Sequence, residues 1–247
     1  SAPQQSSARK RFWKQVDVVQ EEGGYAVQLD GRGVRLPGRM PLCVPSRALA
    51  EALAAEWRAA GQTADGSFTP AELPLTGIGG SMLERIPGAR EGVRASLLAY
   101  AGSDLLCYRD GANPALGDRQ RMEWDPWLDW LARETGARLE VTQGVMPIPQ
   151  PEQAVEALRA ALAACSDAEL AVLGVAAPAL GSLVLGLALL REAASPAVLA
   201  ACATLDERAQ MAVWGEDPEV TDRMAAMQDE VEHAARFLAS FRQGLSV

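Results

Sequence analysis

The side chains most able to do chemistry are few, beginning with a single histidine. His233 follows Glu230 in a Glu-x-x-His spacing, which places both on one helix face and forms half of a carboxylate-bridged two-metal site. The other half needs a second histidine, and the chain has only one. Any Ser-His or Cys-His catalytic pair would also depend on His233, and no serine lies in a nucleophile elbow. The sequence therefore predicts no metal, no cofactor and no nucleophilic centre.

Acidic side chains gather around Trp214-Gly215. They are Asp206, Glu207, Glu216, Asp217 and Glu219. Paired carboxylates can act as acid and base when a cleft tunes their pKa values. The same residues can also form a solvated helix end or a recognition patch for a basic or helix-bearing partner. The residues alone leave these three interpretations open.

Three tryptophans, Trp124, Trp127 and Trp130, recur three residues apart, close to one helical face. Such a stripe is most typical of a core, although it could also stack on sugars or hold a partner. Pro126 lies within the stripe and is expected to break or kink the helix.

A glycine-rich segment, Gly77-Ile78-Gly79-Gly80, matches neither the phosphate loop nor the dinucleotide fingerprint. It has no P-loop lysine and falls inside a helical stretch. Close packing between helices is therefore the preferred explanation for its small residues.

The composition narrows the class of partner. The chain of 247 residues has 49% hydrophobic residues, a net charge of -9 and a pI near 4.8. Nucleic acid and anionic membranes reward basic surfaces, so neither is an expected partner. The four cysteines have no metal or redox spacing, which indicates buried free thiols in a reducing compartment.

One uncharged run, Leu170–Leu190, is long enough to cross a bilayer, since about 20 apolar residues suffice. Pro178, Gly181 and Ser182 interrupt it, and it has no Trp or Tyr belt. A Ser166/Glu169 capping box opens it. We therefore expect a buried helical hairpin, separated at Pro178, and no membrane insertion.

The first half of the chain mixes strands and helices. Alternation predicts strands over 13–19, 25–29, 34–36 and 42–44, and a further strand over 104–109 that returns to the sheet. Ser46 caps a helix whose Leu49, Leu53 and Trp57 share one face. Helices are expected over 74–86 and 90–101.

The second half is almost entirely helical, with segments over 118–134, 151–165, 196–215 and 218–244. The predicted class is α+β, with a small N-terminal antiparallel sheet and packed helices followed by a C-terminal all-helical orthogonal bundle. Gly, Asn and Pro cluster over residues 111–116. This cluster predicts an N-terminal α/β sandwich domain over 1–112 and a helical bundle domain over 113–247.

Several phrases, in order along nearly the whole chain, carry a family resemblance. They are RFWK (11–14), VQLDGR (27–32), LAE (49–51), AEW (55–57), LPLT (73–76), DLLCYR (104–109), RQ (119–120), WDP (124–126), Trp130, Glu207, Gln210 and WGE (214–216). Together they resemble the assembly chaperone of F-type ATP synthase that binds the α subunit. The chain departs from the family pattern at Ala60, at Gly79-Gly80, at Glu84-Arg85 and near Pro218.

The resemblance implies a protein-binding chaperone and not an enzyme. Such a chaperone holds the free α subunit and covers the apolar face that the β subunit later occupies, until β displaces it. By resemblance, the expected contacts are Glu207 first and Glu216 second, with Gln210 and Trp214 beside them, while Trp57 is either a structural anchor or part of the binding surface. The competing hypothesis is an acidic hydrolase acting on a sugar-like substrate. We expect a monomer in a bacterial cytoplasm, or in the mitochondrial matrix of a eukaryote.

Overall fold

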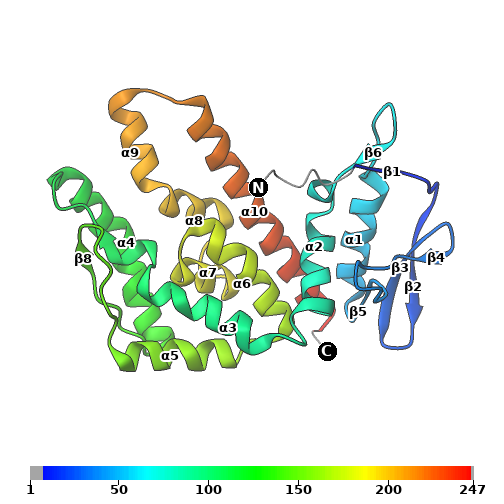
Figure 1. Cartoon of the computed structure of the whole chain (residues 1–247), viewed down its shortest axis with the longest axis horizontal. Helices are drawn as coiled ribbons and strands as arrows, with labels where there is room; N and C mark the ends of the chain where they lie inside the picture. The colour runs from blue at the N-terminus through cyan, green and yellow to red at the C-terminus, as the bar shows by residue number, and fades with distance from the viewer. Residues whose placement is uncertain (1–7, 246–247) are drawn as a thin grey trace, which may run out of the picture. The chain divides into compact units, whose positions relative to one another are not determined.

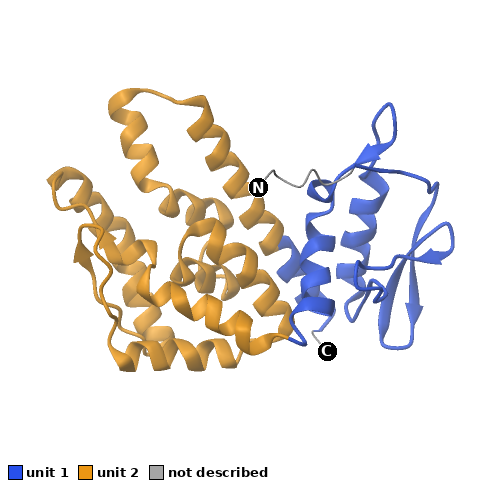
Figure 2. Cartoon of the chain, in the orientation of Figure 1, with its two compact units in different colours: residues 1–88, 236–247 blue, residues 89–235 orange. Residues whose placement is uncertain are grey.

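The computed structural model describes residues 8–245 and confirms the predicted α+β class. Contacts between Cα atoms divide the chain into two compact units (Figure 2): unit 1 comprises residues 1–88 and 236–247, and unit 2 comprises residues 89–235. The division follows Gly88 because α3 (Arg90–Leu98) packs on α5 (Glu152–Ala163) and α6 (Asp167–Leu180) of unit 2. That residues 1–112 and 113–247 behave as separate domains stays a prediction.

Unit 1 is built on a small antiparallel sheet (Figure 1). Its strands are β2 (Val16–Glu21), β3 (Gly24–Leu29), β4 (Arg32–Gly33) and β5 (Cys43–Val44), with β3 central, and a separate pair joins β1 (Arg9–Lys10) to β6 (Ser67–Phe68). Gly24 begins β3 with φ +148°, and a Cβ there would lie 2.3 Å from the Val44 carbonyl oxygen. Only glycine lets β5 approach β3 so closely.

The helix α1 (Arg47–Ala59) packs on this sheet and on α2 (Pro74–Gly80). The Ser46 hydroxyl accepts a hydrogen bond from the Leu49 backbone N–H at 3.2 Å and donates to the Ser240 carbonyl oxygen at 2.8 Å. The predicted cap is thereby confirmed, and it also holds the end of α10 (Pro218–Gln243) within unit 1. Leu49 and Leu53 are fully buried, as the predicted face requires.

Unit 2 is a helical assembly. Besides α3, α5, α6 and the first part of α10, it contains α4 (Pro114–Thr135), α7 (Leu183–Leu190), α8 (Pro196–Ala203) and α9 (Leu205–Trp214). The uncharged run forms the expected hairpin, with α6 packed on α7 and almost every residue of α7 buried. Within residues 8–245, no helix is long and apolar enough to cross a membrane.

Several local expectations were wrong. The single helix expected over 196–215 is two helices, α8 and α9, which meet at Thr204. No strand covers 34–36, where Arg35 forms only an isolated bridge to Pro41. Residues 105–107 form a 3-10 turn, and the two-residue β7 (Tyr108–Arg109) pairs in parallel with β8 (Thr142–Gln143), not with the sheet of unit 1. Pro126 does not break the helix, because α4 continues through it. Pro178 likewise lies inside α6, and the hairpin turns at Gly181, which takes the left-handed conformation. Each helix continues through its proline because packing outweighs one lost hydrogen bond.

Candidate functional site

The helix α9 projects from a well-anchored base. Its first residue, Leu205, is fully buried, and the helix packs on α4 and α8. At its far end Gly215, with φ +89°, donates its N–H to the Met211 carbonyl oxygen at 2.9 Å. Asp217 then accepts the Glu219 N–H at 3.0 Å and starts α10. The connection between the two helices is therefore short and hydrogen-bonded at both ends.

The far end of α9 exposes large apolar side chains. Val213 is 72% exposed and Trp214 is 84% exposed, although apolar side chains of this size are normally covered. Gln210 and Glu216 are exposed beside them. Figure 1 shows α9 and the start of α10 at the edge of unit 2. The structure thus gathers three predicted contact residues, Gln210, Trp214 and Glu216, at one helix end.

The acidic cluster separates into two groups. Asp206 accepts a hydrogen bond at 2.9 Å from the Nε2 of Gln120, whose Oε1 accepts the Asp110 N–H at 2.8 Å. This partly buried bridge joins α9 to α4, so Asp206 has a structural role. Glu207 is half-buried, whereas Glu216, Asp217 and Glu219 are exposed. The hydrogen bond between Gln120 and Asp206 could not be predicted from the residues around Gln120, because its partner lies 86 residues away.

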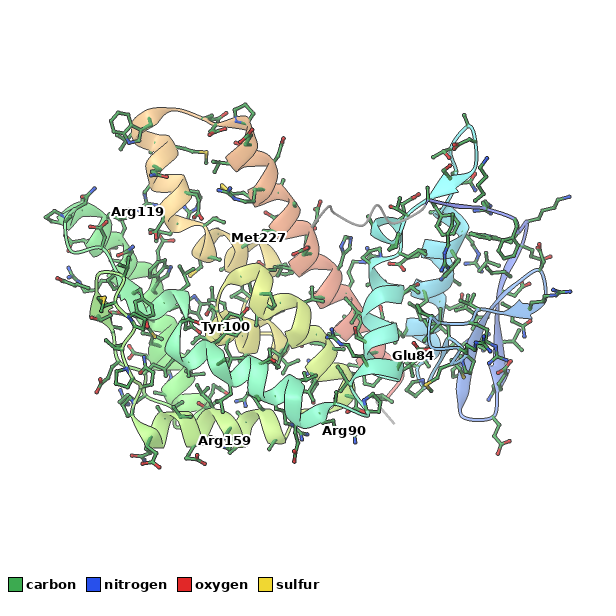
Figure 3. All side chains as sticks on the ribbon, in the orientation of Figure 1. Glu84, Arg90, Tyr100, Arg119, Arg159 and Met227 are labelled. Atoms are coloured by element: carbon green, nitrogen blue, oxygen red, sulfur yellow. The ribbon has the colours of Figure 1, made fainter. Side chains whose placement is uncertain are left out.

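The first half of α10 extends the apolar surface. Val220, Met224 and Met227 are only half-buried, and Met227 is marked in Figure 3. Further along α10, Val231, Ala234, Phe237 and Leu238 are buried. Thr221 of α10 contacts the Met211 sulfur at 3.9 Å, so the two helices meet near the connection. We call the exposed and half-buried residues of α9, the 215–217 connection and the first three turns of α10 the α9–α10 surface.

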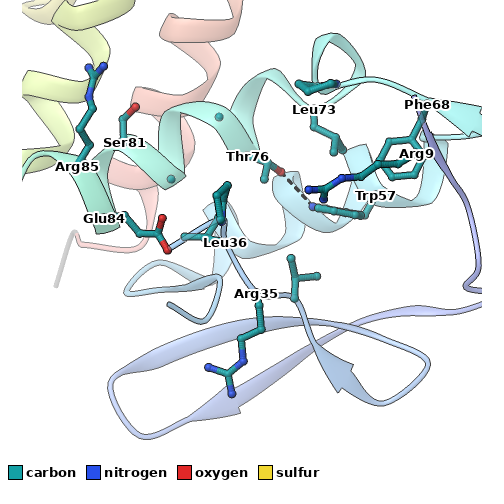
Figure 4. A pocket seen from close by; sticks show the side chains of 15 residues that line it. Arg9, Arg35, Leu36, Trp57, Phe68, Leu73, Thr76, Ser81, Glu84 and Arg85 are labelled. Carbon is teal, nitrogen blue, oxygen red and sulfur yellow. Dashed lines mark hydrogen bonds between the residues drawn. The ribbon is translucent and has the colours of Figure 1, made fainter. Parts of the chain in front are cut away.

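Trp57 lies elsewhere, in the core of unit 1. Only 7% of its surface is exposed, and its ring packs edge-on against Trp13 and Phe68, with centroids 5.3 and 6.2 Å away. Its indole N–H donates to the Thr76 hydroxyl at 3.1 Å, as Figure 4 shows. The surroundings of Trp57 are therefore those of a structural anchor.

Glu56, the neighbour of Trp57, ties α1 to the beginning of α2. Its carboxylate accepts the Leu75 and Thr76 N–H groups at 2.6 and 3.0 Å and the Thr76 hydroxyl at 3.1 Å. Burial raises the pKa of Glu56, outweighing these hydrogen bonds and the charge of Arg236, which lower it. The AEW motif thus supplies both a cap for α2 and an aromatic anchor.

The candidate metal-binding, acid–base and tryptophan residues lie in different surroundings. Among residues 8–245, no three His, Cys, Asp or Glu side chains are grouped to hold a metal ion. Glu216, Asp217 and Glu219 are exposed to solvent. Of the three tryptophans, Trp124 is fully buried and donates to the Cys202 carbonyl oxygen at 2.9 Å, which is a core role.

Comparison with known proteins defines the class. Residues 10–132 match the family model described as ATP12 chaperone protein. The crystal structure of Atp12 from Paracoccus denitrificans is 38% identical, with a TM-score of 0.85 over 94% of this chain and 98% of that one. A protein from Agrobacterium tumefaciens is 35% identical, with a TM-score of 0.86 over 97% of this chain and 87% of that one.

The exposed apolar side chains beside carboxylates at the end of α9 are typical of proteins that act by binding others. The identities and coverage make the assignment specific. The chain belongs to the ATP12 chaperone family.

Proposed function

We propose that this protein is an assembly chaperone of F-type ATP synthase, which binds the unassembled α subunit and shields its subunit interface until the β subunit displaces it. Family membership supports the chaperone class. The single observation that carries the binding role is the α9–α10 surface, where Val213 and Trp214 are 72% and 84% exposed next to carboxylates.

The physical need for such a protein follows from the nature of obligate interfaces. These interfaces are large and apolar, and a subunit that exposes one before assembly is prone to aggregate. A chaperone must cover that surface firmly, yet lose it to the final partner. Displacement by β through the same surface satisfies both conditions and consumes no ATP, provided that the affinity of the chaperone is moderate.

The proposed contacts are Trp214 and Glu207, with Gln210 and Glu216 beside them. Trp214 offers a large, nearly uncovered ring, and aromatic anchors of this kind dominate binding energies. Glu207 is half-buried on α9, where a charge-assisted hydrogen bond to a basic client residue would be partly protected from water. Trp57 serves the fold of unit 1.

The decisive experiment is co-purification of the protein with the isolated α subunit, with and without added β. We expect a complex with α that β dissolves in proportion to its concentration. An α subunit that remains soluble alone and forms no complex would refute the proposal. Co-purification that β leaves unchanged would refute the displacement step.

Substitutions then locate the contact. Trp214→Ala is expected to weaken binding by about 2 kcal/mol or more, and Glu207→Gln by about 1–3 kcal/mol. Met122→Ala and Glu140→Gln are controls, because both side chains are exposed in unit 2 and neither belongs to α9 or α10. Equal effects from the test and control variants would show that the contact lies elsewhere.

A further inference from the structure

Unit 1 contains a groove that the proposed α9–α10 contact does not use. It has a volume of about 500 Å³, within the range of ligand-binding clefts. Its floor is formed by Val34, Leu36, Trp57, Phe68 and Leu73. Each of these side chains is at least 92% buried, so the groove opens directly over the hydrophobic core (Figure 4).

A second hollow of about 340 Å³ adjoins the first. The two share Val34, Trp57 and Phe68, together with Arg9 and Arg35. Arg9 pairs with Phe68 across β1 and β6 and lies alongside Trp57 and Phe68 in Figure 4. The two hollows therefore form one continuous apolar path with cations beside it.

The charge of this path is opposite to that of the protein as a whole. The cations that line the two hollows are Arg9, Lys10, Arg32, Arg35 and Arg85. Within residues 8–245 none of them forms an ion pair. The lining acid, Glu84, already accepts the Gly38 and Met40 N–H groups at 2.8 and 3.0 Å. The net charge of the chain is -9, so this concentration of uncompensated positive charge favours an anionic ligand.

Gly77 keeps the groove open. It lines the groove from α2, where glycine lowers helix stability. A Cβ at Gly77 would meet no atom within 4 Å, whereas a Cβ at Gly79 would lie 3.7 Å from Phe237 and one at Gly80 would lie 3.6 Å from Leu36, both ordinary van der Waals distances. Gly79 and Gly80 therefore face packed side chains that would admit a Cβ, and Gly77 faces open space. The absent side chain leaves space over the groove.

We infer that this groove binds an extended peptide segment in which large apolar side chains are flanked by carboxylates. The inference rests on the proposed function for the source of the segment, which is the client polypeptide. A small anion would contact cations at one place only. Here the cations are spread along the path, with Lys10 and Arg32 at one hollow and Arg85 at the other. Carboxylates spaced along a chain match cations spaced along a path.

The test is isothermal titration calorimetry of the full chain with a short capped peptide that has leucine and phenylalanine between pairs of acidic residues. A second peptide replaces the acidic residues by lysine. We expect the acidic peptide to bind, with an affinity that falls as salt rises, and the lysine peptide to bind at least about tenfold more weakly.

Variants assign the binding to the groove. Gly77→Leu fills the open space and Arg35→Glu reverses an exposed charge, and each is expected to weaken the acidic peptide by about tenfold or more. Gly92→Leu is the matched control, since Gly92 is exposed on α3 and a Cβ there also meets nothing within 4 Å. Arg133→Glu is the control for charge. If Gly77→Leu does not fold, Gly77→Ala is tested in its place, because alanine favours the helix.

Absence of peptide binding, equal binding of both peptides, or equal effects of test and control variants would overturn the inference. Dodecanoate binding that depends on Gly77, without peptide binding, would also overturn it in favour of a lipid-like carboxylate. None of these outcomes requires the α subunit. Failure of α to bind, with the acidic peptide still captured, would therefore refute the proposed client and leave the groove standing.

Discussion

Replacing Trp57 by alanine should strongly lower the free energy of unfolding, whereas replacing Trp214 should hardly change it. For Trp57→Ala, loss of a nearly buried ring costs about 3–5 kcal/mol of the free energy of unfolding. The structure favours the upper part of this range, because the ring also loses edge-on contacts with Trp13 and Phe68 and the hydrogen bond to Thr76. For Trp214→Ala, whose ring is 84% exposed, the expected change is within about 0.5 kcal/mol.

An intermediate variant separates packing from hydrogen bonding. Trp57→Phe keeps an aromatic ring against Trp13 but removes the N–H that reaches Thr76. The lost hydrogen bond costs about 1 kcal/mol and the smaller ring about another 1 kcal/mol. The expected order of destabilisation is therefore Trp57→Ala, then Trp57→Phe, then Trp214→Ala.

The assay must report on unit 1, because a chain with two compact units need not unfold in one step. Urea dependence of amide hydrogen exchange in α1 and β3 gives the free energy of unfolding of that unit. A Trp57→Ala loss below about 1 kcal/mol would refute the structural role of this ring. Equal losses from Trp57→Ala and Trp214→Ala would refute the distinction between anchor and contact.

Three further predictions concern unit 2. Burial raises the pKa of Asp104 to about 6 from 3.8, so between these pH values the folded state holds more protons than the unfolded state and stability falls as pH rises, by roughly 3 kcal/mol at pH 7. Asp104→Asn should therefore reduce the difference in stability between pH 4.5 and pH 7, measured by urea unfolding. An unchanged difference would contradict this prediction. Pro126→Ala restores an N–H that can donate to the Met122 carbonyl oxygen, so it should raise the free energy of unfolding by about 1–3 kcal/mol and increase Tm. A lower Tm would show that the proline ring stabilises the fold. Burial raises the pKa of Cys107 to about 12, so its thiol should resist alkylation at pH 8 until urea unfolds the chain, and rapid labelling in the folded state would disprove this.

Features set by neighbouring residues could be predicted from the sequence. The hydroxyls of Ser46, Ser166 and Ser195 accept N–H groups three residues ahead, at 3.2, 3.2 and 3.3 Å. Each cap needs only its own helix, so the signal is local. The turn before Gly24 and the buried face of α1 follow from equally short patterns.

Features set by distant partners could not be predicted. Asp104 accepts the Leu106 N–H and, 80 residues away, the Val184 N–H, so residues 104–109 belong to the helical unit and not to the first sheet. Nothing in the local alternation carries that information. Pro126 similarly stays helical because α4 packs against α5, α7 and α9, which overrides the local preference for a break.

The candidate contact residues were accessible to sequence reasoning only in part. Trp214 and Glu216 are exposed where the WGE phrase ends α9, but their position at a helix end followed from Gly215, a local signal. Val220, Met224 and Met227 are half-buried, but their spacing is that of a buried stripe, so their partial exposure could not be predicted. A helix that leaves its apolar face uncovered has the same periodicity as one that packs.

The two proposed contact regions carry opposite charge. The α9–α10 surface presents Glu207 and Glu216, whereas the groove of unit 1 presents Arg9, Arg35 and other cations. Each region should therefore attract client segments of the opposite charge, basic segments at the α9–α10 surface and acidic segments at the groove. Because both attractions are electrostatic, adding salt should weaken each of them.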